Sequence, residues 1–365
     1  QNFMYQFDSQ IFYKRRNEFL SKLNGKAAIL PSANLVQHHA DCEYPFRQNS
    51  NFWYLTGFDE PDAIALLLSQ KDEGEKFILF VNPKDRISEV WHGFRWGLDG
   101  AKEVFKADKS HSISEFENML PHYLKDADEL VFSIGKHKKI ESIVLELWSK
   151  QIENSSRTGW APSAIKPPDV FLNEMRLVKS EYEISRMREA TQISADAFEF
   201  ARANLSTKYN ERQLQGLIEG FFLEKGARGP AYNSIVASGD NACVLHYTAN
   251  NSDLKKGELV LIDAGCSLSD YYNGDITRTF PIGGKFSGEQ RAIYEIVLEA
   301  QKNAINNAIA GVDSNHIHYA ALKVLIAGLK DLKLLKGDTE GIIENGSYKH
   351  LYMHRTGHWL GLDVH

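Results

Sequence analysis

The sequence contains few cysteines. There are three in 365 residues, Cys42, Cys243 and Cys266, and no two of them form a Cys-x-x-Cys pair. An odd number of widely spaced cysteines argues against both a disulfide framework and a thiolate zinc site. We therefore expect reduced thiols, with Cys266 serving as a small buried apolar side chain.

Long apolar runs and an excess of charge of one sign are also lacking. Among the longest apolar runs is residues 63–68, far short of the ~20 residues that span a bilayer. Residues 1–14 lack the charged start and apolar centre of a secretory signal. With 25% charged residues and a net charge of -6, the chain has no basic stripe for nucleic acid. These absences predict a cytoplasmic protein with neither a membrane nor a nucleic-acid partner.

The amino-terminal half alternates amphipathic and β-rich segments, which is typical of an α/β domain. Three of the ten prolines then fall within residues 161–168, a density that neither a helix nor a central strand tolerates. We therefore place a domain boundary there, giving domains at 1–168 and 169–365. The expected elements of the first domain are a helix over 12–23 and strands over 27–30, 63–69 and 77–81.

The second domain begins with a helix signal. Ser180, followed by Glu183, forms a capping-box pattern before residues with helical spacing. Further on, the apolar run 258–262 predicts a buried strand, and 275–280 alternates as its partner strand. The polar segment 265–274 between them is predicted to be the turn of a hairpin.

Two aspartates stand at the ends of this predicted hairpin. Asp263 follows the buried strand, where a carboxylate is costly unless a cation or several hydrogen bonds compensate it. Asp275 opens the partner strand, so the two carboxylates can converge, which is the arrangement that hard divalent cations select. A single aspartate beside a glycine turn is more often a turn cap. The pair favours a metal site.

A histidine cluster occupies residues 353–365 and contains His354, His358 and His365. Two glycines in this segment disfavour a helix, so we expect loop and strand that bring His358 and His365 to a site. From the residues alone, metal or acid–base chemistry and ordinary polar packing are equally favoured. His246, within a short Leu-His-Tyr-Thr segment, is a weaker signal.

Together these segments resemble the bacterial aminopeptidase P family of Xaa-Pro aminopeptidases. The matching motifs occur in the family's order, and the likeness covers essentially the whole chain. They are residues 43–58, 246–248, 260–266, 274–280 and 358–365. The resemblance implies a smaller amino-terminal α/β domain followed by a pita-bread catalytic domain.

The resemblance also implies a dinuclear metal centre. In that family two divalent ions, with manganese the expected metal, are bridged by a hydroxide and held by two aspartates, one histidine and two glutamates. Asp263 and Asp275 match the aspartates, and His358 matches the histidine. The implied function is hydrolysis of the bond between an amino-terminal residue and a following proline.

Other family features concern the substrate and the assembly. His246, His354 and His365 match histidines that line the substrate site and stabilise the reacting carbonyl. Peptides with proline at the second position are the implied partners, and the implied assembly is a homo-oligomer, a dimer or a tetramer. In relatives a tryptophan of a neighbouring subunit closes the pocket, and Trp91 and Trp96 are the candidates here.

Two departures from the family pattern qualify this expectation. The two glutamates lie beyond the position of residue 365 in relatives, so we expect a carboxy-terminally truncated form that binds metal weakly and has little peptidase activity. The spacing of the aspartates is one residue longer, with 267–273 forming a larger turn. Two alternative functions stay open: a prolidase acting on dipeptides only, and a non-catalytic peptide-binding module on the same fold.

Overall fold

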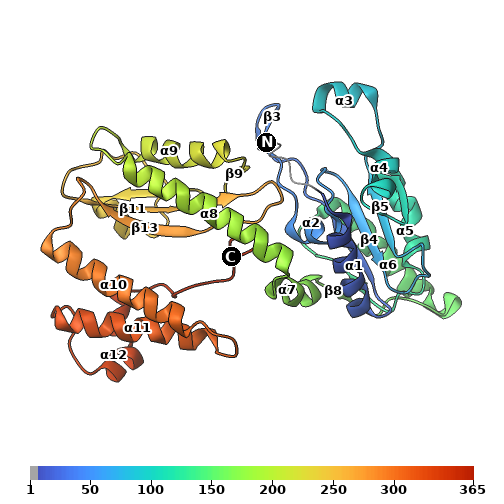
Figure 1. The fold of residues 1–365 in the computed structure, drawn as a ribbon. Helices are drawn as coiled ribbons and strands as arrows, with labels where there is room; N and C mark the ends of the chain where they lie inside the picture. Colours follow the sequence, from blue (N-terminus) through green and yellow to red (C-terminus); the bar gives the residue numbers. More distant parts are fainter. Residues whose placement is uncertain (1–6) are drawn as a thin grey trace. The chain divides into compact units, whose positions relative to one another are not determined.

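The computed structural model describes residues 7–365, which form two compact units, 7–179 and 180–365 (Figure 1). The division lies between Lys179 and Ser180, whereas the sequence predicts it between 168 and 169. The helix α7 (Asp169–Leu177) belongs to the first unit, because it packs on α1 (Ser9–Leu23). The rings of Phe19 and Phe171 meet edge to face there, 6.1 Å apart.

The first unit is built on a six-stranded mixed sheet with the order β6-β5-β4-β1-β7-β8. β1 pairs with β4 antiparallel and with β7 parallel. The strands predicted near residues 27–30, 63–69 and 77–81 are confirmed as β1, β4 and β5. The strand bounds are β1 (Ala27–Pro31), β4 (Ile64–Leu68), β5 (Phe77–Val81), β6 (Lys109–Ser112), β7 (Leu130–Val131) and β8 (Ile165–Lys166).

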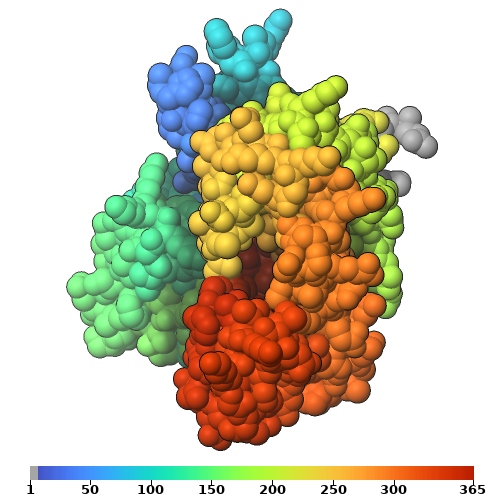
Figure 2. Space-filling view, turned by 90° about the vertical axis from the view of Figure 1, so that its left-hand side faces the viewer, coloured from blue at the N-terminus to red at the C-terminus, as the bar shows by residue number. Residues whose placement is uncertain are grey.

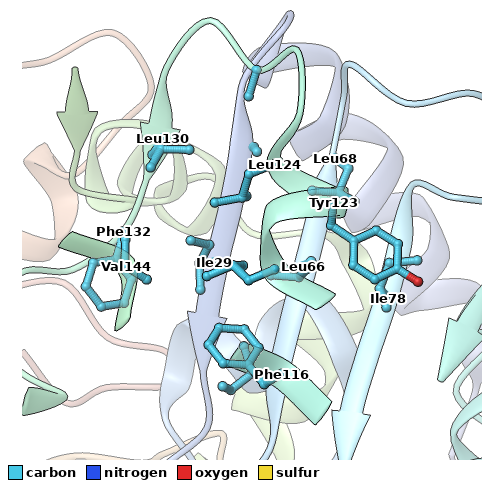
Figure 3. Packing of buried hydrophobic residues seen from close by; sticks show 14 of the residues in the cluster. Ile29, Leu66, Leu68, Ile78, Phe116, Tyr123, Leu124, Leu130, Phe132 and Val144 are labelled. Carbon is cyan, nitrogen blue, oxygen red and sulfur yellow. The ribbon is translucent and has the colours of Figure 1, made fainter. Parts of the chain in front are cut away.

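The central strands of this sheet are buried along their whole length, because helices cover both faces. On one face, Phe116 of α5 and Val144 of α6 pack against Ile29 and Leu66 (Figure 3). On the other, α1 and α2 contact the strands β4 and β1. The remaining elements are β2 (Gln37–His39), β3 (Cys42–Glu43), α2 (Ser50–Thr56), α3 (Arg86–His92), α4 (Gly97–Glu103), η1 (Ile113–Glu115), α5 (Phe116–Leu124) and α6 (Lys138–Thr158).

The second unit places helices against a three-stranded antiparallel sheet with the order β10-β11-β13. The helices α8 and α9 pack on this sheet, while α10 and α11 pair with each other as a separate layer (Figure 1). Ser180 and Glu183 form the predicted reciprocal cap of α8. The bounds are α8 (Glu181–Ala203), α9 (Glu211–Glu224), β10 (Ile235–Ser238), η2 (Gly239–Cys243), β11 (Leu259–Ala264), β13 (Ile276–Pro281), α10 (Gly288–Asn307), α11 (Ser314–Asp331), α12 (Thr339–Asn345) and η3 (Ser347–His350).

The predicted hairpin is confirmed: β11 and β13 are antiparallel, with Asp263 opposite Thr277. The segment between them is more than a turn. It contains β12 (Cys266–Ser267), which pairs with β9 (Gly229–Pro230), and it is largely buried. The segment does connect the two antiparallel strands, as predicted. Its burial was not predicted: the carboxylate of Asp270 is fully buried and is paired with Arg186 of α8 at 2.7 Å.

The three cysteines are unpaired, as predicted. Cys266 is buried and its Sγ lies 3.3 Å from the carbonyl oxygen of Ala190, while Cys42 and Cys243 are exposed. Burial raises the pKa of the Cys266 thiol to about 11, as expected for an inert packing residue. Within residues 7–365, none of the helices has the length and apolarity that crossing a membrane requires.

Candidate metal centre

Asp263 and Asp275 meet at one hydroxyl group. The hydroxyl oxygen of Tyr232 lies 2.6 Å from Oδ1 of Asp263 and 2.7 Å from Oδ1 of Asp275. A phenol has one proton, so it donates to only one of the two carboxylates at a time. Burial and the two negative charges raise the pKa of Tyr232 well above its ordinary value, so the hydroxyl stays protonated. The arrangement concentrates negative charge that a cation would compensate.

Two glycines let the backbone bring these aspartates together. A Cβ on Gly265 would lie 1.8 Å from the carbonyl oxygen of Gly274, and a Cβ on Gly274 would lie 2.5 Å from Oγ of Ser194 in α8. Gly274 also donates its N–H to the carbonyl of Cys266 at 2.9 Å. A larger side chain at Gly265 would push the two strand ends apart, and one at Gly274 would push the residues before β13 away from α8. Either change would move the carboxylates.

His358 joins this pair from the carboxy-terminal segment, residues 353–365. The prediction that this segment is not helical is confirmed, whereas the predicted strand is wrong, because the segment is loop throughout. Its Nε2 lies 3.1 Å from Oδ2 of Asp275, and its Nδ1 lies 2.8 Å from the carbonyl oxygen of Trp359. A carbonyl only accepts, so Nδ1 carries a proton. In the neutral ring, the lone pair of Nε2 then faces the carboxylate. Metal-binding histidines use the same pattern, donating one ring N–H to a carbonyl and ligating through the other nitrogen.

His365 lies beside His358, with ring centroids 4.5 Å apart. The carboxy-terminal segment, dark red in Figure 2, is visible at the bottom of a hollow in the surface of the second unit. Yellow, orange and red segments of the same unit border this hollow (Figure 2). In the described part of the chain, His365 is therefore linked to Asp275 only through His358.

His246 and His354 are placed differently. Both are exposed, His246 in the loop after η2 and His354 with its Nδ1 2.8 Å from the carbonyl oxygen of Arg355. Among the described residues, no hydrogen bond or ring contact joins either of them to Asp263 or Asp275. The structure thus brings together four of the six predicted site residues.

Carboxylate oxygens and an imidazole nitrogen are ligand types that hard or borderline divalent cations take. The set present here is partial: no group of three His, Cys, Asp or Glu side chains in residues 7–365 is arranged to hold a metal ion. Asp263 and Asp275 are joined through Tyr232, and His358 approaches only Asp275. The three residues therefore fit a metal centre in chemistry while leaving coordination positions to other groups.

Sequence reasoning missed Tyr232 and Glu211. Tyr232 precedes β10 in a segment without a recognisable pattern. Glu211, at the start of α9, is fully buried and holds the loop that carries His246. Its carboxylate accepts hydrogen bonds from the backbone N–H and hydroxyl of Ser238, the amide of Asn241, the hydroxyl of Tyr247 and the backbone N–H of Ser252. Burial acts to raise the pKa of Glu211, but these donors lower it below the ordinary value.

Comparison with known proteins identifies the family. Residues 185–365 match the model of metallopeptidase family M24, and residues 12–132 match the aminopeptidase P amino-terminal domain. The chain is 42% identical to the Xaa-Pro aminopeptidase of Haemophilus influenzae over 366 residues, covering 100% of this chain and 82% of that protein. The chain belongs to the Xaa-Pro aminopeptidase family.

Further relatives agree with this assignment of the Xaa-Pro aminopeptidase family. Escherichia coli Xaa-Pro aminopeptidase is 38% identical over 99% of this chain and 82% of its own length. Saccharomyces cerevisiae intermediate cleaving peptidase 55 is 34% identical over 97% of this chain and 70% of its own length.

Solved structures of the family confirm the predicted fold class. Pseudomonas aeruginosa aminopeptidase PepP superposes with a TM-score of 0.94 at 38% identity, over 99% of this chain and 82% of that one. Zinc-substituted E. coli aminopeptidase P in complex with product gives the same values. This member of the family is therefore a metallopeptidase with an aminopeptidase P amino-terminal domain and an M24 pita-bread domain.

Proposed function

We propose that this enzyme removes an amino-terminal residue that precedes proline, using two divalent metal ions, with manganese as the expected metal. The observation that carries the proposal is the meeting of Asp263 and Asp275 at the hydroxyl of Tyr232, with His358 beside them. When bound, such ions supply hydroxide near neutral pH and polarise the scissile carbonyl. The zinc-substituted relative supports metal use in the family.

The chain's own residues would divide the work. Asp263, Asp275 and His358 would hold metal, with the carbonyl of Trp359 fixing the orientation of the His358 ring. His365, 4.5 Å from His358, would hydrogen-bond the oxyanion of the tetrahedral intermediate. His246 and His354 would form the walls around the proline.

The substrate class follows from the chemistry of proline. Because proline has no N–H, a site for Xaa-Pro bonds cannot hold the scissile bond through that donor. Such bonds also populate the cis isomer appreciably, so the site must select one isomer, and trans is expected. The substrates proposed are thus peptides with a trans Xaa-Pro bond at their amino terminus.

We further propose that a protein consisting of residues 1–365 alone has weak metal binding and little turnover. Two aspartates and one histidine supply less negative charge than a dinuclear site of divalent ions requires. Titration with Mn²⁺ and an assay on an Xaa-Pro tripeptide would test this, with E. coli aminopeptidase P as the reference. Turnover equal to that of the reference would contradict the proposed impairment. Mn²⁺ binding without any involvement of Asp263, Asp275 or His358 would contradict the proposed site.

Two alternative functions are separable by substrate and chelator. A prolidase would cleave Xaa-Pro dipeptides and leave longer peptides intact, so a length series distinguishes it from an aminopeptidase. A non-catalytic peptide-binding module would bind a proline peptide equally with and without EDTA. The meeting of the two aspartates favours the aminopeptidase or prolidase over the module, because a module needs no metal.

We propose a cytoplasmic homo-oligomer, a dimer or a tetramer, and α3 supports self-association. The helix has no buried residue, and it exposes 78% of both Val90 and Trp91. Trp96, by contrast, packs edge to face on Phe105 at 5.4 Å. Of the two tryptophans, Trp91 is therefore the better candidate for contact with a second copy. Sedimentation of a Trp91→Ala variant would test this, and an unchanged oligomer would contradict the role of α3.

A further inference from the structure

The turn between the two aspartates ends in a buried asparagine, Asn273, that forms hydrogen bonds to the segment 358–365, which carries His358 and His365. We infer that Asn273 is a positioning residue, which sets His358 and His365 against Asp275; this inference rests on the proposed function of the site. Asn273 is 3% exposed. Its hydrogen-bond partners are backbone carbonyls of the segment that carries the histidines. Asn273 therefore acts on the imidazoles through the backbone and not by direct contact.

Three hydrogen bonds join Asn273 to the segment 358–365. The side-chain amide nitrogen of Asn273 donates to the carbonyl oxygens of Gly361 and Leu362, each at 3.0 Å. The backbone N–H of Asn273 donates to the carbonyl of Gly361 at 3.1 Å. Leu362 is itself only 3% exposed, so these bonds lie away from water, where loss of a partner is costly.

The residues at both ends of these hydrogen bonds are close in sequence to the proposed metal ligands. Asn273 is two residues before Asp275 in the sequence. The carbonyls that accept its hydrogen bonds belong to residues 361 and 362, midway between His358 and His365. The N–H of Gly361 donates to the carbonyl of Asp363 at 3.0 Å, closing a tight turn at the same point. The turn at residues 361–363 sets the direction of the chain on either side of it. By holding this turn, Asn273 orients both His358 and His365.

The turn between the aspartates is held by contacts of its own. The N–H of Leu268 donates to the carbonyl of Tyr272, and the N–H of Tyr271 donates back to the carbonyl of Leu268, both at 2.9 Å. Arg186 of α8 holds Asp270 in the middle of the turn. Asn273 therefore projects from a turn that is held in place on both sides.

A second anchor holds the upstream part of the same segment. The hydroxyl of Thr356 lies 2.9 Å from Nδ1 of His318 and 2.9 Å from the hydroxyl of Tyr352. These contacts tie the segment to the α10–α12 layer. Asn273 instead ties it to the hairpin that carries the aspartates, so the distance between His358 and Asp275 depends on Asn273.

Two variants test the inference in the full chain. Asn273→Asp turns the donor amide into a carboxylate that faces two carbonyl oxygens, whereas Asn273→Ala only removes the donors. We expect the Kd for Mn²⁺, measured by electron paramagnetic resonance of free Mn²⁺, to rise about 10- to 100-fold, as for other residues that orient metal ligands, and more for the aspartate. In the metal-free protein, amide hydrogen exchange over residues 357–365 should become faster.

The matched control is Asn303→Ala. Asn303 also donates its side-chain amide to a backbone carbonyl, that of Ala320, but it lies between α10 and α11. This variant should bind Mn²⁺ with a Kd within about twofold of wild type, because its site is independent. If Asn273→Asp does not fold, the milder Asn273→Ala decides the question.

The outcomes separate the inference from the proposed function. If wild type and Asn273→Ala bind Mn²⁺ with the same Kd, the inference is overturned and the proposed function is unaffected. If Asp275→Asn binds Mn²⁺ as tightly as wild type does, the proposed function is overturned, and the inference with it. Weakened binding in both Asn273 variants, with Asn303→Ala unaffected, supports the inference.

Discussion

Nε2 of His358 lies 3.1 Å from Oδ2 of Asp275, although the two residues are far apart in the sequence. Because Nδ1 of His358 is engaged with the carbonyl of Trp359, Nε2 is the nitrogen left to face the carboxylate. In the absence of a cation, this contact is favourable only when the imidazole is protonated. A divalent ion between the two groups would satisfy both while the histidine stays neutral.

Asp275→Asn should therefore weaken metal binding strongly without unfolding the chain. The amide is isosteric with the carboxylate but lacks its charge, so we expect the Kd for Mn²⁺ to rise by more than about 100-fold, beyond the effect of losing an orienting residue. Calorimetric titration would measure this. Asp331→Asn, at an exposed aspartate at the end of α11, is the control and should leave the Kd unchanged. Equal affinities of wild type and Asp275→Asn would exclude Asp275 as a ligand.

The sequence was sufficient to predict the hairpin and its aspartates, because a short apolar run followed by an alternating one is a local signal. It was also sufficient for the capped start of α8, whose signal spans only Ser180 to Glu183. The buried state of the turn could not be predicted. Asp270 is stabilised by Arg186, which lies on another element, and no local pattern reveals such a pair.

The same reason explains why Tyr232 and Asn273 were missed. Tyr232 acts on two aspartates, one in β11 and one just before β13, and Asn273 acts on carbonyls near the carboxy-terminal end. Each contact joins residues that are distant in the sequence, so it exists only after the chain has folded. The residue types alone, a tyrosine and an asparagine in polar segments, are as common on ordinary surfaces.

Glu211→Gln should loosen the loop that carries His246. The substitution places an amide group where five donors point at the carboxylate, so at least one donor loses its acceptor in a buried site. We expect a loss of about 3 kcal/mol in the free energy of unfolding. Urea denaturation would measure it, and hydrogen exchange over residues 239–252 should become faster.

The control for this prediction is Glu224→Gln, at an exposed glutamate at the end of the same helix, α9. It should change the free energy of unfolding by less than about 0.5 kcal/mol. If the two variants are equally stable, the hydrogen bonds of Glu211 contribute no net stability. In that case the loop must be held by other contacts.

Arg186→Ala should destabilise the second unit through Asp270. The carboxylate of Asp270 is fully buried, and removing Arg186 takes away its cationic partner. The hydroxyl of Tyr182, which donates to Oδ2 at 2.6 Å, is a neutral donor and compensates the charge only in part. Breaking such a pair costs about 3–5 kcal/mol. Arg188→Ala, two positions further along α8 at an exposed site, should cost less than about 0.5 kcal/mol. Thermal unfolding of both variants would measure the difference, and similar melting temperatures would show that Asp270 becomes neutral or hydrated instead.

His318 should make the stability of the second unit depend on pH. Burial, and secondarily the charge of Arg355, lower the pKa of His318 below its ordinary value of 6.5. Since the unfolded chain then takes up a proton more readily than the folded one, the stability from neutral His318 is present above about pH 6.5 and is lost as pH falls through the lowered pKa.

We expect the free energy of unfolding to decrease between about pH 7 and about pH 5, and this decrease to be smaller in His318→Gln. The physical reason is that a proton on His318 must be accommodated in a buried site beside Arg355, where its Nδ1 already contacts the hydroxyl of Thr356. His316→Gln, at an exposed position of α11, should retain the wild-type pH dependence. Denaturation curves at a series of pH values would measure the slopes. An unchanged slope in His318→Gln would assign the acid sensitivity to other groups, and the anchor of Thr356 would then be insensitive to pH.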